Sequence, residues 1–363
     1  GGKGPIGGFV PTRYEDMMHT PYIDLLNNRK VQKDSPWFET WIRDYFSTSD
    51  YWKGISYQGK ENYGKIKVPS LAVYGWFDYH LKGVENGVLD DPPVHVFVMG
   101  HNRWRAEQDW PLPGTKFTKY YIHSGGKANS SAGDGTLSTT PPGDEPPDRY
   151  TYDPMHPTLS AFKGPHIDGP VDTRPVSTGQ DLLIYTTPPL ADDLVVIGPI
   201  TAKLYAATSA RDTDWMVRLV DVHPDGYAAL LCDGIIRARC RDPEQSGAFT
   251  STKLSQIEPG RVYEYLIEFW RATGNAFLKG HRIRIEISSS YYSLYLRNLN
   301  TGADNVGLET SHVIAHQTIH HDATRPSHVV PVSYTHLRAH ETSDDISYAV
   351  FCLKSGGGGG GGG

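Results

Sequence analysis

Short β-type segments dominate the chain from residue 92 onward. Runs rich in Val, Ile, Thr, Tyr and Phe are separated there by turn clusters of Gly, Pro and Asp, as at residues 141–144, 223–226 and 258–260. Helical spacing of apolar residues is almost absent from this part, so the sequence predicts an antiparallel β-sandwich or jelly roll. The expected strands are residues 94–99, 119–123, 181–186, 194–197, 201–206, 215–220, 262–269, 282–288 and 312–319.

Two other regions differ from this one in composition and in the spacing of their apolar residues. Residues 125–172 are rich in Gly, Ser, Pro and Asp, which predicts a long surface excursion with little regular structure. Residues 14–18 and 37–46 carry apolar side chains at three- and four-residue spacing, which predicts short helices.

Composition and charge exclude several classes of protein. The 363 residues include 35 Lys and Arg against 41 Asp and Glu, for a net charge of −6, and the basic residues form no patch that would bind nucleic acid. No apolar run approaches the roughly 20 residues of a membrane-spanning helix. The cysteines Cys232, Cys240 and Cys352 are too few and too irregularly spaced for a disulfide framework or a zinc site.

Both ends of the sequence are unusual. The chain opens with Gly-rich residues 1–4 and no initiator Met or apolar signal region, which predicts an internal cut in a longer protein. Residues 332–342 resemble the in-frame translation of a sequencing adapter, and eight consecutive glycines occupy 356–363. We therefore expect residues 332–363 to be a non-native tail, in which His336, His340 and Cys352 carry no chemistry. An engineered linker would lead to the same expectation.

An acidic side chain follows one predicted strand upstream of the β-rich region. Residues 66–74 have the pattern of a strand whose buried part begins after Pro69, and Asp78 lies on the turn that follows. Open α/β sheets place their active sites at the carboxyl ends of strands, so Asp78 is a candidate catalytic acid. Its alternative role is that of a turn former or helix N-cap.

Several motifs resemble the C-terminal jelly-roll domain of the CocE/NonD serine hydrolases, a family of esterases, α-amino acid ester hydrolases and X-prolyl dipeptidyl aminopeptidases. These motifs are residues 97–104, 109–113, 133–137, 152–154, 188–190, 212–214, 219–226 and 287–290. Upstream, residues 36–38, 51–56 and 68–78 resemble the end of that family's helical cap and a late strand of its α/β-hydrolase domain.

The resemblance implies a mostly β chain, in which a truncated α/β-hydrolase and helical-cap remnant precedes a jelly-roll β-sandwich. The implied domains are a helical cap remnant at 1–64, a hydrolase remnant with the acid turn and a linker at 65–83, a jelly roll of the X-Pro dipeptidyl-peptidase C-terminal type at 84–331, and the tail at 332–363.

The resemblance also implies a reaction. A Ser on a strand-to-helix elbow attacks an acyl carbon, a His takes its proton and an Asp orients the His, and Asp78 matches the position of that Asp. The expected substrates are small acyl esters, amides or short peptides such as X-Pro dipeptidyl peptides. We expect no cofactor, metal, nucleic acid or membrane partner. The sequence leaves open whether the chain forms a homo-oligomer.

The other two members of the catalytic triad have no match. In the family the nucleophile precedes the cap, inside which this chain begins, and a loop carrying the His follows the acid. Here residues 77–79 run directly into 80–87, which resemble the linker to the jelly roll. A join between two similar Phe-Asp-Tyr stretches would account for this, and Asp78 could then belong to either side. We expect the chain alone to be inactive because it lacks the Ser and the His.

An imitation of the triad is present. Residues 54–59 match the elbow pattern Gly-x-Ser-Tyr-x-Gly, and Ser56, Asp78 and His101 follow in family order. An elbow needs a buried strand before the Ser, whereas residues 47–53 are polar and aromatic. We therefore expect Ser56 to form a turn and His101 to be a surface or hydrogen-bonded polar residue.

The remaining histidines and aspartates favour structural roles. His316, His320 and His321 lie near Asp322, but a strand would turn the neighbours His320 and His321 to opposite faces, which disfavours a metal site. The acids around predicted turns are expected to accept backbone hydrogen bonds, without the loop spacing of a calcium site. These acids are Asp212, Asp214, Asp221 and Asp225.

A second class of function also fits a jelly roll. Because this fold hosts both enzyme-associated and ligand-binding domains, a non-catalytic β-sandwich binding module, for example for carbohydrate, is the alternative to a hydrolase fragment.

Overall fold

A computed structural model describes the β-rich part of the chain. The described residues are 79, 81–85, 87, 90, 92, 94–110, 112, 114–162, 170–241, 255–269, 273–303, 309–334 and 351–352, with the backbone alone for 332–334 and 351–352. The helices predicted at 14–18 and 37–46 and the strand predicted at 66–74 lie outside the described residues.

The chain divides into two compact units. The first comprises residues 1–91 and 303–311, and the second comprises 92–302 and 312–363. Two turns are described in the first unit: the Gly83 amide donates to the Tyr79 carbonyl at 3.0 Å, and the Asp90 amide donates to the Gly87 carbonyl at 2.9 Å. All the strands that the structure describes lie in the second unit. No described helix is long and apolar enough to cross a membrane.

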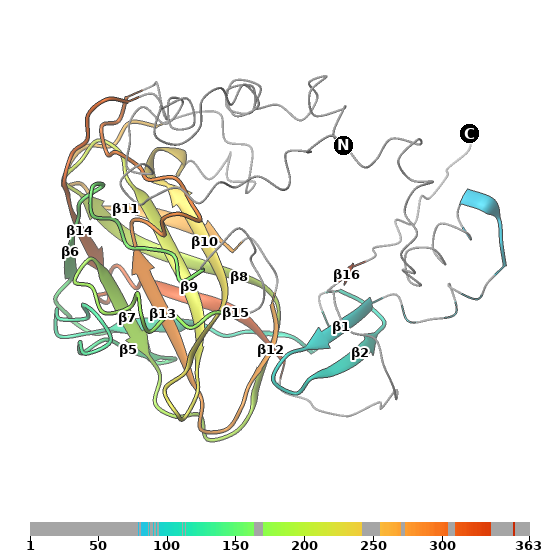
Figure 1. Cartoon of the computed structure of the whole chain (residues 1–363). Coiled ribbons are helices and arrows are strands. Elements are labelled where there is room, and N and C mark those ends of the chain that lie inside the picture. The colour runs from blue at the N-terminus through green and yellow to red at the C-terminus, as the bar shows by residue number, and fades with distance from the viewer. Residues whose placement is uncertain are drawn as a thin grey trace, which may run out of the picture. The chain divides into compact units, whose positions relative to one another are not determined.

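The second unit is built almost wholly from β-strands (Figure 1). They are β1 (Val94–Val98), β2 (Arg103–Glu107), β3 (Lys116–Phe117), β4 (Tyr120–His123), β5 (Thr136–Ser138), β6 (Asp148–Tyr152), β7 (Leu182–Thr186), β8 (Leu194–Thr208), β9 (Asp214–Val222), β10 (Ala228–Arg237), β11 (Tyr263–Glu268), β12 (Thr273–Phe277), β13 (Arg282–Ser288), β14 (Ala315–His320), β15 (His328–Tyr334) and β16 (Phe351–Cys352). One short 3-10 helix, η3 (Ala238–Cys240), follows β10.

Thirteen of the strands form one folded sheet. Its order is β10-β9-β13-β7-β5-β4-β15-β8-β14-β6, with β11 and β12 paired to β8 and β3 paired to β15. The named strands pair antiparallel except β5 with β7. β1, β2 and β16 form a separate small sheet.

The strands lie in two packed layers. Figure 1 shows β9, β13 and β7 side by side, with β8 and β15 crossing behind them. One apolar cluster joins the layers, because it contains Leu219 of β9 and Ile285 of β13 together with Leu204 of β8 and Val329 of β15. The predicted jelly-roll β-sandwich is therefore confirmed.

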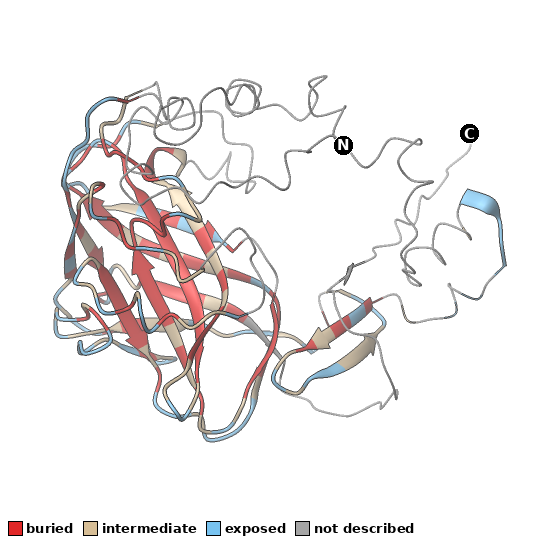
Figure 2. Ribbon diagram, in the orientation of Figure 1, coloured by how far each residue is buried: buried red, intermediate tan, exposed pale blue. Residues whose placement is uncertain are grey.

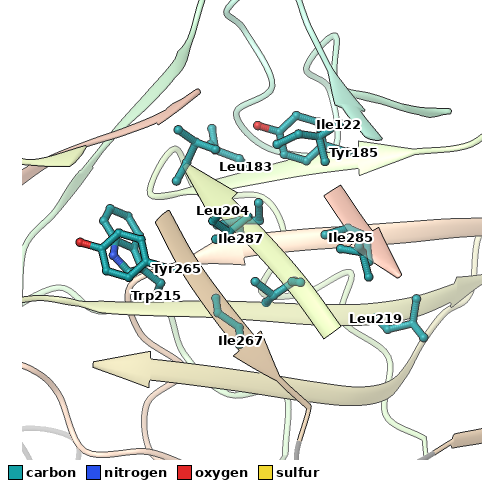
Figure 3. Packing of buried hydrophobic residues seen from close by; sticks show 14 of the residues in the cluster. Ile122, Leu183, Tyr185, Leu204, Trp215, Leu219, Tyr265, Ile267, Ile285 and Ile287 are labelled. Atoms are coloured by element: carbon teal, nitrogen blue, oxygen red, sulfur yellow. The ribbon is translucent and has the colours of Figure 1, made fainter. Parts of the chain in front are cut away.

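β9 is buried on both of its faces, as Figure 2 shows in red. Trp215 and Leu219 point into the cluster between the layers, where the Trp215 ring lies 5.6 Å from that of Tyr265 (Figure 3). Met216 and Val220 point the opposite way, into a second apolar cluster that contains Tyr291. Successive side chains of a strand alternate between its faces, so this central strand carries two cores.

β8 corrects one prediction. Residues 194–197 and 201–206 were expected to be two strands, but β8 runs unbroken through Gly198 and Pro199. Gly198 has a φ of 136°, which favours glycine, and Pro199 is exposed. Partner strands change at this point, with β12 pairing to the first part of β8 and β11 to the second. The Gly-Pro pair therefore bends one strand instead of ending it.

The region 125–172 corrects a second prediction. It was expected to have little regular structure, yet it contains β5 and β6. Side chains of β6 alternate between buried and exposed, so Tyr150 and Tyr152 pack into the sandwich, as Leu137 of β5 does. The Gly- and Pro-rich composition around these short strands obscured the alternation of apolar and polar residues that would have predicted them. At the other end, β15 continues to Tyr334, three residues past the expected boundary at 331.

Candidate functional site

The predicted catalytic acid has no described geometry. Asp78 and Ser56 both lie outside the described residues. His101 is described, and its Nε2 atom lies 2.9 Å from Oδ2 of Asp193. Hydrogen bonds from His101 and from the Lys279 amide lower the pKa of the Asp193 carboxyl. The expectation that His101 is a hydrogen-bonded polar residue is confirmed.

The three neighbouring histidines do not converge. His316 Nδ1 lies 3.2 Å from Oγ1 of Thr151, and burial lowers the pKa of His320. His321 is fully buried and points into the sandwich. Among the described residues, none of these three belongs to a group that could hold a metal ion.

His321 is the centre of a buried network of charged side chains. Its Nδ1 lies 3.1 Å from Oε2 of Glu145, and its Nε2 lies 3.0 Å from Oδ2 of Asp148. Ser124 Oγ lies 3.2 Å from the same Nε2 atom. His123 Nδ1 lies 2.7 Å from Oε1 of Glu145. We call these five residues the His321 network.

Strand pairing positions this network. β14 pairs with β6 so that Ile319 lies opposite Asp148, which places His321, two residues further along, beside the start of β6. Ser124 follows the end of β4. Asp148 accepts further hydrogen bonds, from Tyr185 Oη at 2.8 Å and from the Ala128 amide at 3.0 Å.

The network places the His321 imidazole between two carboxylates, which favour its protonated form. Burial disfavours the charged imidazole, but the hydrogen bond to Asp148 and the charges of Asp148 and Glu145 outweigh burial and raise the pKa of His321. Burial also disfavours the charged form of both acids, and this effect alone would raise the pKa of Asp148 and of Glu145. Hydrogen bonds from His321 and Ser124 lower that of Asp148, and those from His123 and Ser124 lower that of Glu145.

The connectivity of Ser124, His321 and Glu145 imitates a catalytic triad, but its chemistry differs. The Ser124 hydroxyl donates to Asp148 Oδ2 at 2.6 Å. A protonated His321 has both nitrogens committed to carboxylates and no lone pair to accept the Ser124 proton. A hollow of about 730 Å³ lies beside Glu145, yet neither Ser124 nor His321 lines it. The direction of the Ser124 hydrogen bond and the position of the hollow favour a structural role for the network over nucleophilic attack.

Three of the four predicted turn acids, Asp212, Asp214 and Asp221, make side-chain contacts. Arg237 Nε lies 3.7 Å from Oδ2 of Asp212 and 3.4 Å from Oδ1 of Asp214, and Asn298 donates to Asp214 at 2.8 Å. Burial and the neighbouring Asp214 raise the pKa of Asp212 to about 6. Their partners include the side chains of Arg237, on the paired strand β10, and of Asn298, in the segment after β13, where only backbone donors were predicted. Asp225 follows the expectation, since it accepts the Tyr227 amide at 2.9 Å.

Among the described residues, one group could hold a metal ion: Asp221, His223 and His281. The sequence presented Asp221 as a turn acid, but its Oδ1 lies 2.9 Å from Nδ1 of His281. Sequence reasoning did not connect the two because they are 60 positions apart, and only the pairing of β9 with β13 brings them together.

The chain is similar to known hydrolases through its β-rich part. Residues 86–330 match the family model of the X-Pro dipeptidyl-peptidase C-terminal non-catalytic domain. Cocaine esterase of Rhodococcus sp. (strain MB1 Bresler) is 42% identical over 262 residues, which is 70% of this chain and 44% of that protein. The chain thus spans less than half the length of this relative.

Solved structures give the same result. The aminopeptidase of the marine sediment archaeon Thaumarchaeota archaeon superposes with a TM-score of 0.62 and 27% identity, over 72% of this chain and 44% of that one. An α-amino acid ester hydrolase superposes with a TM-score of 0.61 and 25% identity, over the same shares of the two chains.

Proposed function

Because this chain belongs to the family of X-Pro dipeptidyl-peptidase C-terminal non-catalytic domains, and with it to the CocE/NonD hydrolases, we propose that it is part of a serine hydrolase that cleaves acyl ester or amide bonds. The observation that carries the proposal is the 42% identity to cocaine esterase over 262 residues. In the described residues the His321 network brings a Ser, a His and two acids together, but its Ser124 hydroxyl donates to Asp148, which fits a domain that supports catalysis without performing it.

The proposed division of labour follows the domain order. Residues 1–64 are a cap remnant, 65–83 a hydrolase remnant with the acid turn and a linker, 84–331 the jelly roll and 332–363 a non-native tail. The jelly roll stabilises the hydrolase domain and helps to wall the substrate cleft. Small acyl esters, amides and short X-Pro peptides are the proposed substrate classes.

Asp78 is the proposed orienting acid of the complete enzyme. A Ser hydroxyl attacks the carbonyl carbon and passes its proton to a His, which then protonates the leaving alcohol or amine; water releases the acyl group in a second step. Asp78 accepts the other N–H of that imidazole and stabilises the imidazolium that forms. The 363 residues contain no match to the family's Ser elbow in a strand-turn-helix setting or to its His loop, so we propose that this polypeptide alone is inactive.

A chromogenic ester assay tests this proposal. We expect the 363-residue chain to hydrolyse 4-nitrophenyl butyrate no faster than buffer and to take up no serine-directed fluorophosphonate. The matched variant is Ser56→Ala, which changes the imitation elbow. Turnover and labelling that are both abolished by Ser56→Ala would show that Ser56 is a nucleophile and would overturn the proposal.

A binding module is the second candidate, favoured by the description of the matched domain as non-catalytic. Saturable retention of the chain on a polysaccharide column, without turnover of any ester, would support this alternative.

A further inference from the structure

Three side chains of residue types that commonly bind metal ions, Asp221, His223 and His281, meet at one end of β9 and β13. In this antiparallel pair Asp221 lies opposite Ile283, and Val222 lies opposite Arg282. Continuing the register by one residue places His223 opposite His281. Residues two apart on a strand share a face, so Asp221 and His223 point to the same side.

The donor atoms of these side chains lie close together. One nitrogen of each imidazole and one carboxylate oxygen lie within 4.8 Å of one another. Asp221 Oδ1 is 2.9 Å from His281 Nδ1, and Asp221 Oδ2 is 3.9 Å from His223 Nε2. Ligands bound tetrahedrally at about 2.0–2.2 Å from zinc are roughly 3.4 Å apart. The two measured separations, one to each oxygen of Asp221, lie on either side of that value, so the spacing of the donors is close to that of zinc ligands.

The cluster is buried on its inner side. Asp221 and His281 are 4% and 9% exposed. Asn275 of β12 donates from Nδ2 to Oδ2 of Asp221 at 3.5 Å, a weak contact that orients the carboxylate. Carboxylate ligands of metal ions commonly have such outer partners.

The outer side of the cluster is open. The side chain of His223 is 37% exposed, which gives an ion a path from solvent. Its backbone is nevertheless fixed, because its amide donates to the Tyr227 carbonyl at 2.8 Å and its carbonyl accepts the Gly226 amide at 2.9 Å. The imidazoles of His223 and His281 face each other with ring centroids 4.3 Å apart.

We propose that Asp221, His223 and His281 bind a divalent transition-metal ion of the zinc class, with water in the fourth position. Two imidazole nitrogens and one carboxylate oxygen suit zinc, whereas calcium and magnesium take oxygen ligands. In neutral His281 the proton on Nδ1 moves to Nε2 of the same ring when Nδ1 coordinates, so the imidazole stays neutral. The ion ties the turn between β9 and β10 to the start of β13, and it takes no part in ester hydrolysis.

Zinc titration of the full chain, freed of metal by a chelator, tests the site. We expect one equivalent of Zn²⁺ to bind with an affinity that His223→Gln lowers on the order of 100-fold. The matched control is His156→Gln, which changes a histidine that is 83% exposed and paired with Asp153, and which leaves the affinity unchanged. Ca²⁺ at the same concentration leaves the thermal unfolding midpoint where it is, whereas Zn²⁺ raises it.

His223→Gln is the decisive variant because its side chain is partly exposed, whereas substitution of buried Asp221 or His281 could disturb the fold. Circular dichroism of the metal-free variant confirms that it folds. Cobalt(II) supplies an independent readout, since its visible absorption reports tetrahedral coordination. Equal zinc affinity in the wild type and His223→Gln, or a cobalt spectrum that the substitution leaves unchanged, would contradict the proposal.

Discussion

Arg218 and Glu286 lie directly opposite each other on β9 and β13, both fully buried, with Arg218 Nε 3.4 Å from Glu286 Oε2. The Arg218 guanidinium also lies over the ring of Tyr291, 4.4 Å from its centroid. Glu286 Oε1 accepts hydrogen bonds from Thr173 Oγ1 at 3.1 Å and Ser177 Oγ at 2.8 Å. This ion pair therefore links two strands of one layer to the loop that covers them.

Breaking this pair is expected to be costly. Glu286→Gln leaves Arg218 as a buried charge without its partner and should lower the free energy of unfolding by about 3–5 kcal/mol. The double variant Arg218→Met/Glu286→Leu removes both charges and should cost less than the single one. Urea unfolding of the wild type and the two variants measures this difference, and a double variant that loses as much stability as Glu286→Gln, or more, would contradict it.

The core between the layers should be sensitive to cavities. Trp215 is fully buried beside Tyr265, so Trp215→Ala is expected to lower the free energy of unfolding by about 3–5 kcal/mol. The control is Leu266→Ala on β11, where the side chain is 41% exposed and the loss should stay within about 0.5 kcal/mol. Similar midpoints of urea unfolding for the two variants would disprove this packing.

A close approach of backbones joins the small sheet to β12. Gly100 has a φ of 84°, and a Cβ atom there would lie 2.3 Å from the carbonyl oxygen of Ala276. Gly100→Ala should therefore destabilise the protein by at least about 1–3 kcal/mol. Gly143→Ala is the control, since a Cβ atom there meets nothing within 4 Å. Thermal unfolding compares the two, and an equal midpoint would argue against the contact.

The His321 network makes stability depend on pH. The raised pKa of His321 contributes stability that is fully present below the unfolded pKa of about 6.5 and is lost as the pH rises through the folded value. The lowered pKa values of Asp148 and Glu145 contribute stability above about pH 4, which is lost as the pH falls through their folded values. The network is thus most stabilising between about pH 4.5 and 6.5.

Urea midpoints between pH 5 and pH 9 test this effect. We expect the wild type to lose stability relative to His321→Gln as the pH rises, because only the wild type carries the imidazolium. His156→Gln, at an exposed position, should follow the wild type. A constant difference between the wild type and His321→Gln across this range would refute the charge state assigned to His321.

The sequence predicted those strands whose composition and period agree. Residues 282–288 match β13, whose apolar side chains alternate with polar ones. β10 was not predicted, since its Ala-rich start and its central Asp233-Gly234 weaken the strand pattern. β6 was missed because turn-forming residues surround it.

The two clusters of polar side chains, around His321 and around Asp221, could not be predicted from the sequence for another reason. His321 meets Asp148 across 173 positions, and His281 meets Asp221 across 60. Each meeting depends on which strands pair and in which register, and local patterns do not encode either. Asp78 came from a resemblance to a family motif, and it stays a prediction because it lies outside the described residues.

Esterase activity of a chimaera tests most directly whether this chain is the accessory part of a serine hydrolase. Residues 84–331 would replace the matching C-terminal domain of the Rhodococcus cocaine esterase, to which this chain is 42% identical over 262 residues. We expect a folded chimaera that hydrolyses 4-nitrophenyl butyrate with a kcat/KM within about tenfold of that of the parent enzyme, a change of about 1.4 kcal/mol at most. A folded chimaera without turnover, beside an active parent, would contradict it.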